Sequence, residues 1–445
     1  MVRCGKGQSG VFDIARVRGL YESLSEGWTY LNAGRRAQVP EKVSSAVSRA
    51  FRASPLQGPD GGARGDHYVS AAREAVADLV GASPDCVVLG PSRATLLGIL
   101  ATAVPAKLRM GREVVLSRVD EPSNITPWKL AADLYGASVR WAEADLTTGA
   151  LPAWQFTSLI SLDTSIVAVP AANAHLGTVT DIRAIADIMR AKSRAWLVVD
   201  AGAYAPYRKI DLDAWDADVV ALDMAPLGGP EVGALVFRDP ALLAELHLVE
   251  LRRGRHAAPD SQELTARRVA ELERDGNAPG MLGGVPAAVN HLAGLDEEAT
   301  GTRRERLATS LQSSEEYLGR LAGYLVDGLR DLENVHVVGV DGEIDAEPEH
   351  DHNSWGSPTE NRGQHFGPVD RLPRVSFLVQ GIEASVVGER LLSNGVVAQT
   401  VGLEESALFD QMGVAEMGGA ICVALAPHNT HMDIDHLVRV VGGIV

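Results

Sequence analysis

Three carboxylates, Asp200, Asp223 and Glu121, are the first candidates for chemistry in this chain. Asp200 and Asp223 lie near the ends of short apolar runs, and Glu121 follows a third run. Carboxylates that share one cleft disfavour each other's charged form, which raises the pKa of one of them. A carboxyl group with a raised pKa is suited to proton transfer. One hypothesis is therefore an enzyme that uses these groups as acid and base without a cofactor.

Three arginines are candidates for binding an anion. Arg93 can hold a phosphate through two parallel hydrogen bonds, or it can form an ion pair with Asp223. Arg35 and Arg36 are adjacent, and two fixed cations can bind a substrate carboxylate or another anion. The alternative interpretation of Arg35 and Arg36 is a pair of surface arginines.

The remaining motifs give no sign of metal or nucleotide chemistry. The three cysteines, Cys4, Cys86 and Cys422, form no C-x-x-C pair, which is typical of a reduced protein without a zinc site. The histidines of the polar stretch 343–372 match no closed zinc pattern. The chain also has no P-loop and no G-x-S-x-G motif. The sequence therefore predicts no metal.

Composition and charge describe a soluble globular protein. Of the 445 residues, 46% are apolar and 22% are charged, so the chain has ample apolar surface to bury. The net charge of −17 disfavours binding to nucleic acid or to an anionic membrane surface. No run of apolar residues is long enough to span a bilayer, and residues 1–10 lack the apolar core of a secretory signal. We therefore expect a cytoplasmic protein with no nucleic-acid or membrane partner.

A large sheet must position the carboxylates. Short runs rich in Val, Leu, Ile and Ala alternate with segments of helical pattern, which predicts an α/β layer with a mainly parallel sheet. Seven strands are predicted, at Cys86–Pro91, Glu113–Arg118, Ser138–Ala144, Ser165–Ala171, Trp196–Ala201, Val219–Met224 and Gly233–Arg238.

The C-terminal third predicts a smaller α+β domain. A long charged helix at 297–332 precedes four expected strands, and a last helix follows at about 432–440. The strands are expected at Val335–Val340, Arg374–Val379, Val396–Val401 and Ala420–Ala426. We therefore expect an N-terminal segment at 1–50 that packs with the small domain, a large domain at 51–295 and the small domain at 296–445. A polar insertion at 343–372 is expected to be an exposed, disordered loop.

Six short phrases occur in an order that resembles one known family, the class V aminotransferases and cysteine desulfurase-like proteins. These are fold type I enzymes that depend on pyridoxal phosphate (PLP). The resemblance covers nearly the whole chain and implies their α/β fold and a homodimer. The phrases are Tyr30-Leu31-Asn32-Ala33-Gly34, Asn124 with Pro127-Trp128, Leu176-Gly177-Thr178, Val198-Val199-Asp200, Gly229-Pro230 with Gly233, and Ala426-Pro427-His428-Asn429-Thr430.

The resemblance places the family's cofactor groups on this chain, and several are changed. It implies that Asp200 is the carboxylate that keeps the PLP ring nitrogen protonated. Pro226 stands where the family has the lysine that bonds to PLP, and no lysine follows Lys209. Asp223 stands in place of a serine that binds the phosphate. In the phosphate loop Ser92-Arg93-Ala94-Thr95, Thr95 keeps its hydroxyl, but Ala94 has replaced another.

The changes extend to the groups that meet the PLP ring. By the same resemblance, Glu121 stands in place of a stacking histidine, and Ala203 in place of a polar group. The asparagine that meets the ring hydroxyl is Ala174 here, although Asn173 is its neighbour. Covalent PLP is therefore not expected.

Three functions remain open from the sequence. The first is a catalytically altered or inactive family member that acts by binding a protein partner or a small anion. The second is a PLP-dependent aminotransferase or cysteine desulfurase that holds PLP non-covalently. The third is the cofactor-free use of the cleft carboxylates described above. Neither Cys86 nor Cys422 suits a desulfurase nucleophile, because both fall in predicted strands.

Overall fold

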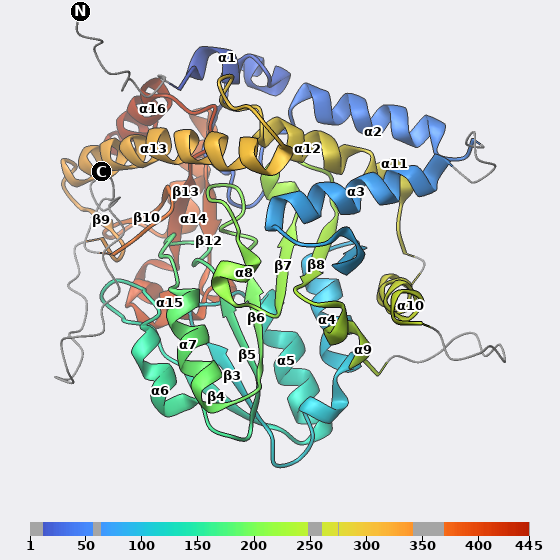
Figure 1. The fold of residues 1–445 in the computed structure, drawn as a ribbon. Coiled ribbons are helices and arrows are strands. Elements are labelled where there is room, and N and C mark those ends of the chain that lie inside the picture. The colour runs from blue at the N-terminus through green and yellow to red at the C-terminus, as the bar shows by residue number, and fades with distance from the viewer. Residues whose placement is uncertain (1–11, 57–63, 248–259, 275, 341–368, 445) are drawn as a thin grey trace, which may run out of the picture.

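A large sheet with helices on both faces dominates the computed structural model, which describes residues 12–56, 64–247, 260–274, 276–340 and 369–444 (Figure 1). The order of the strands is β2-β8-β7-β6-β5-β3-β4. Strands β3 to β7 are parallel to their neighbours among themselves, and β8 is antiparallel to both β7 and β2. The strands are β2 (Val87–Gly90), β3 (Glu113–Ser117), β4 (Ser138–Ala142), β5 (Thr164–Pro170), β6 (Trp196–Asp200), β7 (Val219–Asp223) and β8 (Gly233–Phe237). The predicted fold class is confirmed.

Both faces of this sheet are buried, which explains its nearly unbroken apolar runs. In β2, Val87 and Leu89 belong to one core, and Val88 between them belongs to the other. The first core includes residues of α3 (Arg64–Val80), α7 (Ile182–Lys192) and α12 (Gly284–Leu292). The second includes residues of α4 (Arg93–Ala103), α5 (Pro122–Tyr135) and α10 (Ser261–Glu273).

A second, antiparallel sheet with the order β12-β13-β10-β9 lies in the C-terminal part. A third core packs it against the long helix α13, which starts at a capping box formed by Thr302 and Glu305. The elements are α13 (Arg303–Arg330), β9 (Val335–Val337), β10 (Arg374–Val379), α14 (Ala384–Ser393), β12 (Gln399–Val401), β13 (Ala420–Ala424) and α16 (His431–Gly442).

The segment expected as one strand at 396–401 is two strands. β11 (Val396–Val397) pairs in parallel with β1 (Thr29–Tyr30), and only β12 joins the antiparallel sheet. The N-terminal segment therefore meets the C-terminal part through β1. Its helix α2 (Glu41–Ala53) instead packs on α3, α11 (Pro279–Leu282) and α12. Shorter helices are α1 (Ile14–Arg18), α6 (Phe156–Leu159), α8 (Leu212–Trp215), α9 (Pro240–Ala244) and α15 (Ala407–Gln411).

Most of the polar insertion expected at 343–372 lies outside the described residues, as do its three histidines. Its last residues correct the prediction of an exposed loop. Arg371 is buried and donates hydrogen bonds to the carbonyls of Leu176, Thr148 and Gly339. Leu372 is also fully buried and belongs to the third core, so the end of this segment is packed. Within the described ranges, no helix combines the length and apolar character needed to cross a membrane.

Candidate functional site

Four of the residues singled out from the sequence come together at the carboxyl ends of the parallel strands. Asp200 ends β6 and Asp223 ends β7. Glu121 precedes the first turn of α5, and Arg93 is the first residue of α4. Parallel strands with crossover helices bring their carboxyl ends to one edge of the sheet, where ligands of such folds bind.

The guanidinium of Arg93 joins the three carboxylates. It donates to Asp200, it lies 2.8 Å from Glu121 Oε2, and its Nε lies 3.4 Å from Asp223 Oδ2. Its Nη2 also donates to the hydroxyl of Ser123 at 3.2 Å. The side chain of Arg93 is buried, and the side chain of Asp200 is only 2% exposed. Of the two roles predicted for Arg93, the structure has the ion pair with Asp223, extended to Asp200 and Glu121.

Asp223 also occupies the start of helix α4. Its Oδ1 accepts the backbone N–H of Arg93 at 2.7 Å. Ser92 caps the same helix by accepting the N–H of Thr95, whose hydroxyl lies 2.9 Å from Ser92 Oγ. The first turn of a helix attracts an anion because its N–H groups are unpaired and its dipole is positive there. In this chain that anion is a carboxylate of the protein itself.

The cluster perturbs the pKa values of its members. Burial raises the pKa of Asp200 to about 6, against the opposing effect of Arg93. Burial would also raise the pKa of Glu121, but Arg93 outweighs it and the pKa is lowered. Asp120, missed from the sequence, lies next to the cluster, and burial and the charge of Asp200 raise its pKa well above the usual value. Burial also raises the pKa of Asp223, so more than the one expected carboxyl has a raised pKa.

A cavity of about 370 Å³ opens beside this cluster. Arg93 and Glu121 form part of its wall, whereas Asp200 and Asp223 do not. The other lining residues are Gly34, Arg35, Pro122, Ser123, Ala174, His175, Arg374, Gln399, Glu404 and Glu405. A volume of this size is ordinary for a small-molecule site.

The main cation that sequence reasoning missed is Arg374, the first residue of β10. It is 3% exposed and donates to the carbonyls of Ala174 at 2.6 Å and Ala203 at 3.4 Å. Its guanidinium has no carboxylate within ion-pair distance among the described residues, and its Nε has no hydrogen-bond partner there. The only sequence signal is an arginine that opens a predicted apolar strand, which is unusual for a buried position.

The two adjacent arginines of the N-terminal loop have different places. Arg35 lines the cavity and lies 3.5 Å from Glu405 Oε2. Arg36 is 73% exposed, lies 2.6 Å from Glu231 Oε1 and is not part of the cavity wall. Arg36 therefore fits the interpretation as a surface arginine, and Arg35 lies at the rim of the site.

The side chains of the two candidate asparagines form hydrogen bonds within the protein itself. Asn124 is fully buried within α5, where it donates to Asp120 at 2.7 Å and accepts from the indole of Trp128 at 3.2 Å. Asn173 donates to the carbonyl of Val119 at 2.7 Å and accepts the backbone N–H groups of His175 and Leu176. Neither side chain lines the 370 Å³ cavity.

Pro226 lies in the tight turn after β7 and lines a separate cavity of about 30 Å³, together with Tyr21 and His428. None of the lysines in the described part of the chain lines either cavity. Both described cysteines, Cys86 and Cys422, are buried, and burial raises their pKa values to about 11 and about 12. Among the described residues no group of three or more His, Cys, Asp or Glu side chains is arranged to hold a metal ion.

A comparison with known protein families shows the family to which this chain belongs. The model of the class V aminotransferase family matches residues 29–343. This chain belongs to that family. An uncharacterized protein of Mycobacterium tuberculosis is 41% identical over 97% of this chain and 99% of its own length. The cysteine desulfurase IscS of Acinetobacter baumannii is 23% identical over 85% of this chain and 82% of its own.

Solved structures of other proteins have the same fold as this class V aminotransferase family member. The cysteine desulfurase CsdA of Escherichia coli aligns with a TM-score of 0.76 at 20% identity, over 97% of this chain and 98% of its own. The cysteine desulfurase of Thermococcus onnurineus gives 0.77 at 18% identity, over 98% of this chain and 99% of its own.

The residues present do not fit the PLP of this family. The ring nitrogen needs the carboxylate of Asp200, but its Oδ1 already accepts from the cationic Arg93 and from the N–H of Gly202, and only Oδ2 has no hydrogen-bond partner among the described residues. The phosphate needs the open start of α4, but Asp223 occupies its first N–H. A phosphate placed 4 Å from Asp223 would be repelled by about 4 kcal/mol per unit charge at an effective dielectric constant near 20.

Proposed function

We propose that this class V family member carries out no covalent PLP chemistry and acts by binding a small carboxylate in the cavity of about 370 Å³. The observation that carries the proposal is the buried guanidinium of Arg93, which is held by Asp200, Glu121 and Asp223. It places one positive charge of the protein itself among these three carboxylates, where the resemblance to the family would place the protonated ring of PLP. Pro226 supports the same conclusion, since it offers no amine.

Arg374 favours a carboxylate as the ligand. A buried guanidinium without a carboxylate partner gains strongly from an incoming anion, because the pair can form two charge-assisted hydrogen bonds. Glu404 and Glu405 also belong to the lining and would attract an ammonium group of the same ligand. A molecule that carries both groups therefore suits this cavity better than a simple dianion.

Cofactor-free acid and base catalysis by the carboxylates is less well supported. Asp200 and Asp223 do not line the cavity, and Glu121, which does, is paired with Arg93. A general base must come within hydrogen-bond reach of the proton that it removes.

Two measurements test the proposal. Titration with PLP, followed by borohydride reduction and peptide mapping, should give no visible aldimine band and no modified lysine. A stoichiometric adduct at Lys129 or Lys209 would contradict it and support a PLP enzyme. Calorimetric titration with amino acids and with matched amines that lack the carboxylate should then show binding of the amino acids alone.

Substitution at Arg374 tests the binding mode. Arg374→Met should lower the affinity for the carboxylate ligand by about tenfold or more, equivalent to about 1.4 kcal/mol of binding free energy. Arg374→Lys should recover part of the affinity, since it restores the charge without the paired hydrogen bonds. Arg36→Met is the matched control, because Arg36 lies in the neighbouring loop but outside the cavity wall. Unchanged affinity in Arg374→Met would overturn the assignment.

A further inference from the structure

Another cavity, of about 580 Å³, lies at the amino ends of the parallel strands, whereas Arg93 lies at their carboxyl ends. Its wall includes Ser165 near the start of β5 and the segment 190–194 that leads into β6. Five cations line it, namely Lys107, Arg112, Arg190, Lys192 and Arg194, and no carboxylate belongs to its described lining. This composition is unexpected in a chain with a net charge of −17.

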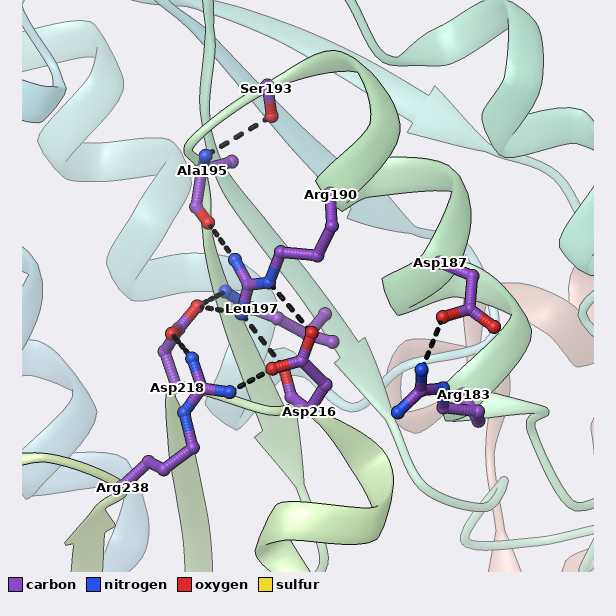
Figure 2. Close-up of polar contacts among 9 residues, drawn as sticks. All are labelled: Arg183, Asp187, Arg190, Ser193, Ala195, Leu197, Asp216, Asp218 and Arg238. Carbon is purple, nitrogen blue, oxygen red and sulfur yellow. Dashed lines mark hydrogen bonds and ion pairs between the residues drawn. The ribbon is translucent and has the colours of Figure 1, made fainter.

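Arg190 is accounted for by the fold. It donates to Asp216 at 3.1 Å and to Asp218 at 2.8 Å, and Arg238 binds the same two carboxylates (Figure 2). Two cations and two anions balance in this group. Arg190 also donates to the carbonyl of Ala195, which ties the end of α7 to β6. It therefore adds little net charge to the cavity.

The two lysines are partly accounted for. Lys107 lies 2.9 Å from Glu245 and 4.5 Å above the ring of the buried Trp196. Lys192 stands in the last turn of α7 and donates to the carbonyl of Thr157. A cation at the C-terminal end of a helix complements the helix dipole, so Lys192 has a structural reason for its position.

No contact within the described part of the chain explains the positions of Arg112 and Arg194. Neither has an ion pair or a side-chain hydrogen bond among the described contacts. They come from different elements, because Arg112 precedes β3 and Arg194 joins α7 to β6. With Lys192 they leave three positive charges without a carboxylate around one opening. Like charges held near each other are unfavourable unless an anion joins them.

We propose that this cavity binds a small multivalent oxyanion, one that carries at least two phosphate or carboxylate groups. The volume falls in the usual range of ligand sites. No aromatic side chain belongs to the described lining, and the ring of Trp196 is buried under Lys107, so no face is offered for stacking a nucleobase. An oligophosphate or an oligocarboxylate therefore fits better than a nucleotide. The site is separate from the Arg93 cluster and does not depend on the function proposed for it.

Calorimetric titration of the full chain with inorganic pyrophosphate, triphosphate and citrate tests this site. The variant is Arg112→Ala with Arg194→Ala, and neither change removes a described ion pair. The matched control is Arg183→Ala with Arg320→Ala, two exposed arginines outside the cavity. We expect saturable binding by the wild type, a loss of at least about tenfold in the variant and no change in the control.

The salt dependence and the choice of anion complete the test. Affinity should fall when the salt concentration rises from about 50 mM to about 200 mM, because exposed charges are screened. Binding of the phosphates alone would assign a phosphate site, and equal binding of citrate would assign a general oxyanion site. Absence of binding at low salt, or equal affinity in the variant and the wild type, would overturn the proposal.

Discussion

The guanidinium of Arg93 donates a hydrogen bond to the carboxylate of Asp200, and both side chains are buried. The contact joins the start of α4 to the end of β6. It places a cation of the protein against the carboxylate that would otherwise face the ring nitrogen of PLP. The same arginine is also paired with Glu121 and Asp223, so one cation is shared by three carboxylates.

Arg93→Leu should therefore be strongly destabilising. Breaking a buried ion pair by removing one partner typically lowers the free energy of unfolding by about 3–5 kcal/mol, because an unpaired charge stays buried. Urea unfolding at neutral pH measures the change. Arg183→Leu is the control and should change stability by less than about 1 kcal/mol, since the Arg183–Asp187 pair is exposed. Equal effects of the two substitutions would show that the cluster contributes no special stability.

Pro226→Lys alone should not produce a protein that binds PLP as an aldimine. The lysine supplies the bond, but Arg93 still holds Asp200 and Asp223 still blocks the start of α4. Groups that act as a unit are strongly non-additive, so one restored member gives little. Visible absorption after addition of PLP measures the outcome.

A combined variant sharpens this test. The resemblance to the family suggests Pro226→Lys with Asp223→Ser, Ala203→His and Glu121→His, and the structure adds Arg93→Ala to release Asp200. We expect PLP absorption only when Arg93 is also changed. A yellow protein from Pro226→Lys alone would mean that the site is one substitution away from covalent PLP binding.

His428 should make the protein less stable in mild acid. It is 1% exposed, its ring contacts Tyr21, and neither ring nitrogen has a hydrogen-bond partner among the described residues. Burial and the nearby Arg18 lower its pKa to about 4, while Asp433 acts in the opposite direction. The unfolded chain binds a proton below about pH 6.5 and the folded chain only below about pH 4, so stability falls as the pH drops through this range.

His428→Leu should remove this loss. At pH 7 the variant should match the wild type within about 1 kcal/mol, and at pH 5 it should be more stable by about 2 kcal/mol. The difference between the two proteins is the useful quantity, because Asp200 titrates in the same range with the opposite sign. Its pKa is raised to about 6, so its protonation favours the folded state as the pH falls. Parallel stability curves for the two proteins from pH 7 to pH 5 would contradict the assignment.

We predict a homodimer that uses the N-terminal loop and α2. Val39, Phe51 and Leu56 belong to this stretch and are exposed, with 71% of Phe51 accessible in the single chain. Light scattering in dilute solution should give the mass of two chains. Phe51→Asp should shift the mass toward one chain, and Met432→Asp, at an exposed apolar residue of α16, should not. A stable monomer for the wild type would refute the prediction.

The sequence by itself determined the central sheet and the family. Strands covered on both faces need continuous apolar runs, so most of the seven could be recognised without their neighbours, the exception being the partly exposed β4. The absence of a lysine after Lys209 and the carboxylate at Asp223 are likewise properties of the chain. The resemblance was enough to expect Asp200, Asp223, Glu121 and Arg93 close together, because it assigned all four to the region of one site.

Only the tertiary structure decided which partner each polar side chain has. Arg93 reaches Asp200 across 107 positions in the chain, and Arg374 reaches Ala174 across 200. Such contacts depend on how crossover helices and the second sheet place distant segments, which local periodicity does not record. For the same reason Asn124 and Asn173, whose residue types suggested a ligand, proved to bind their own chain. Arg374 looked like the beginning of an ordinary strand, and its burial at the cavity follows from its contacts with Ala174 and Ala203, in the segments that follow β5 and β6.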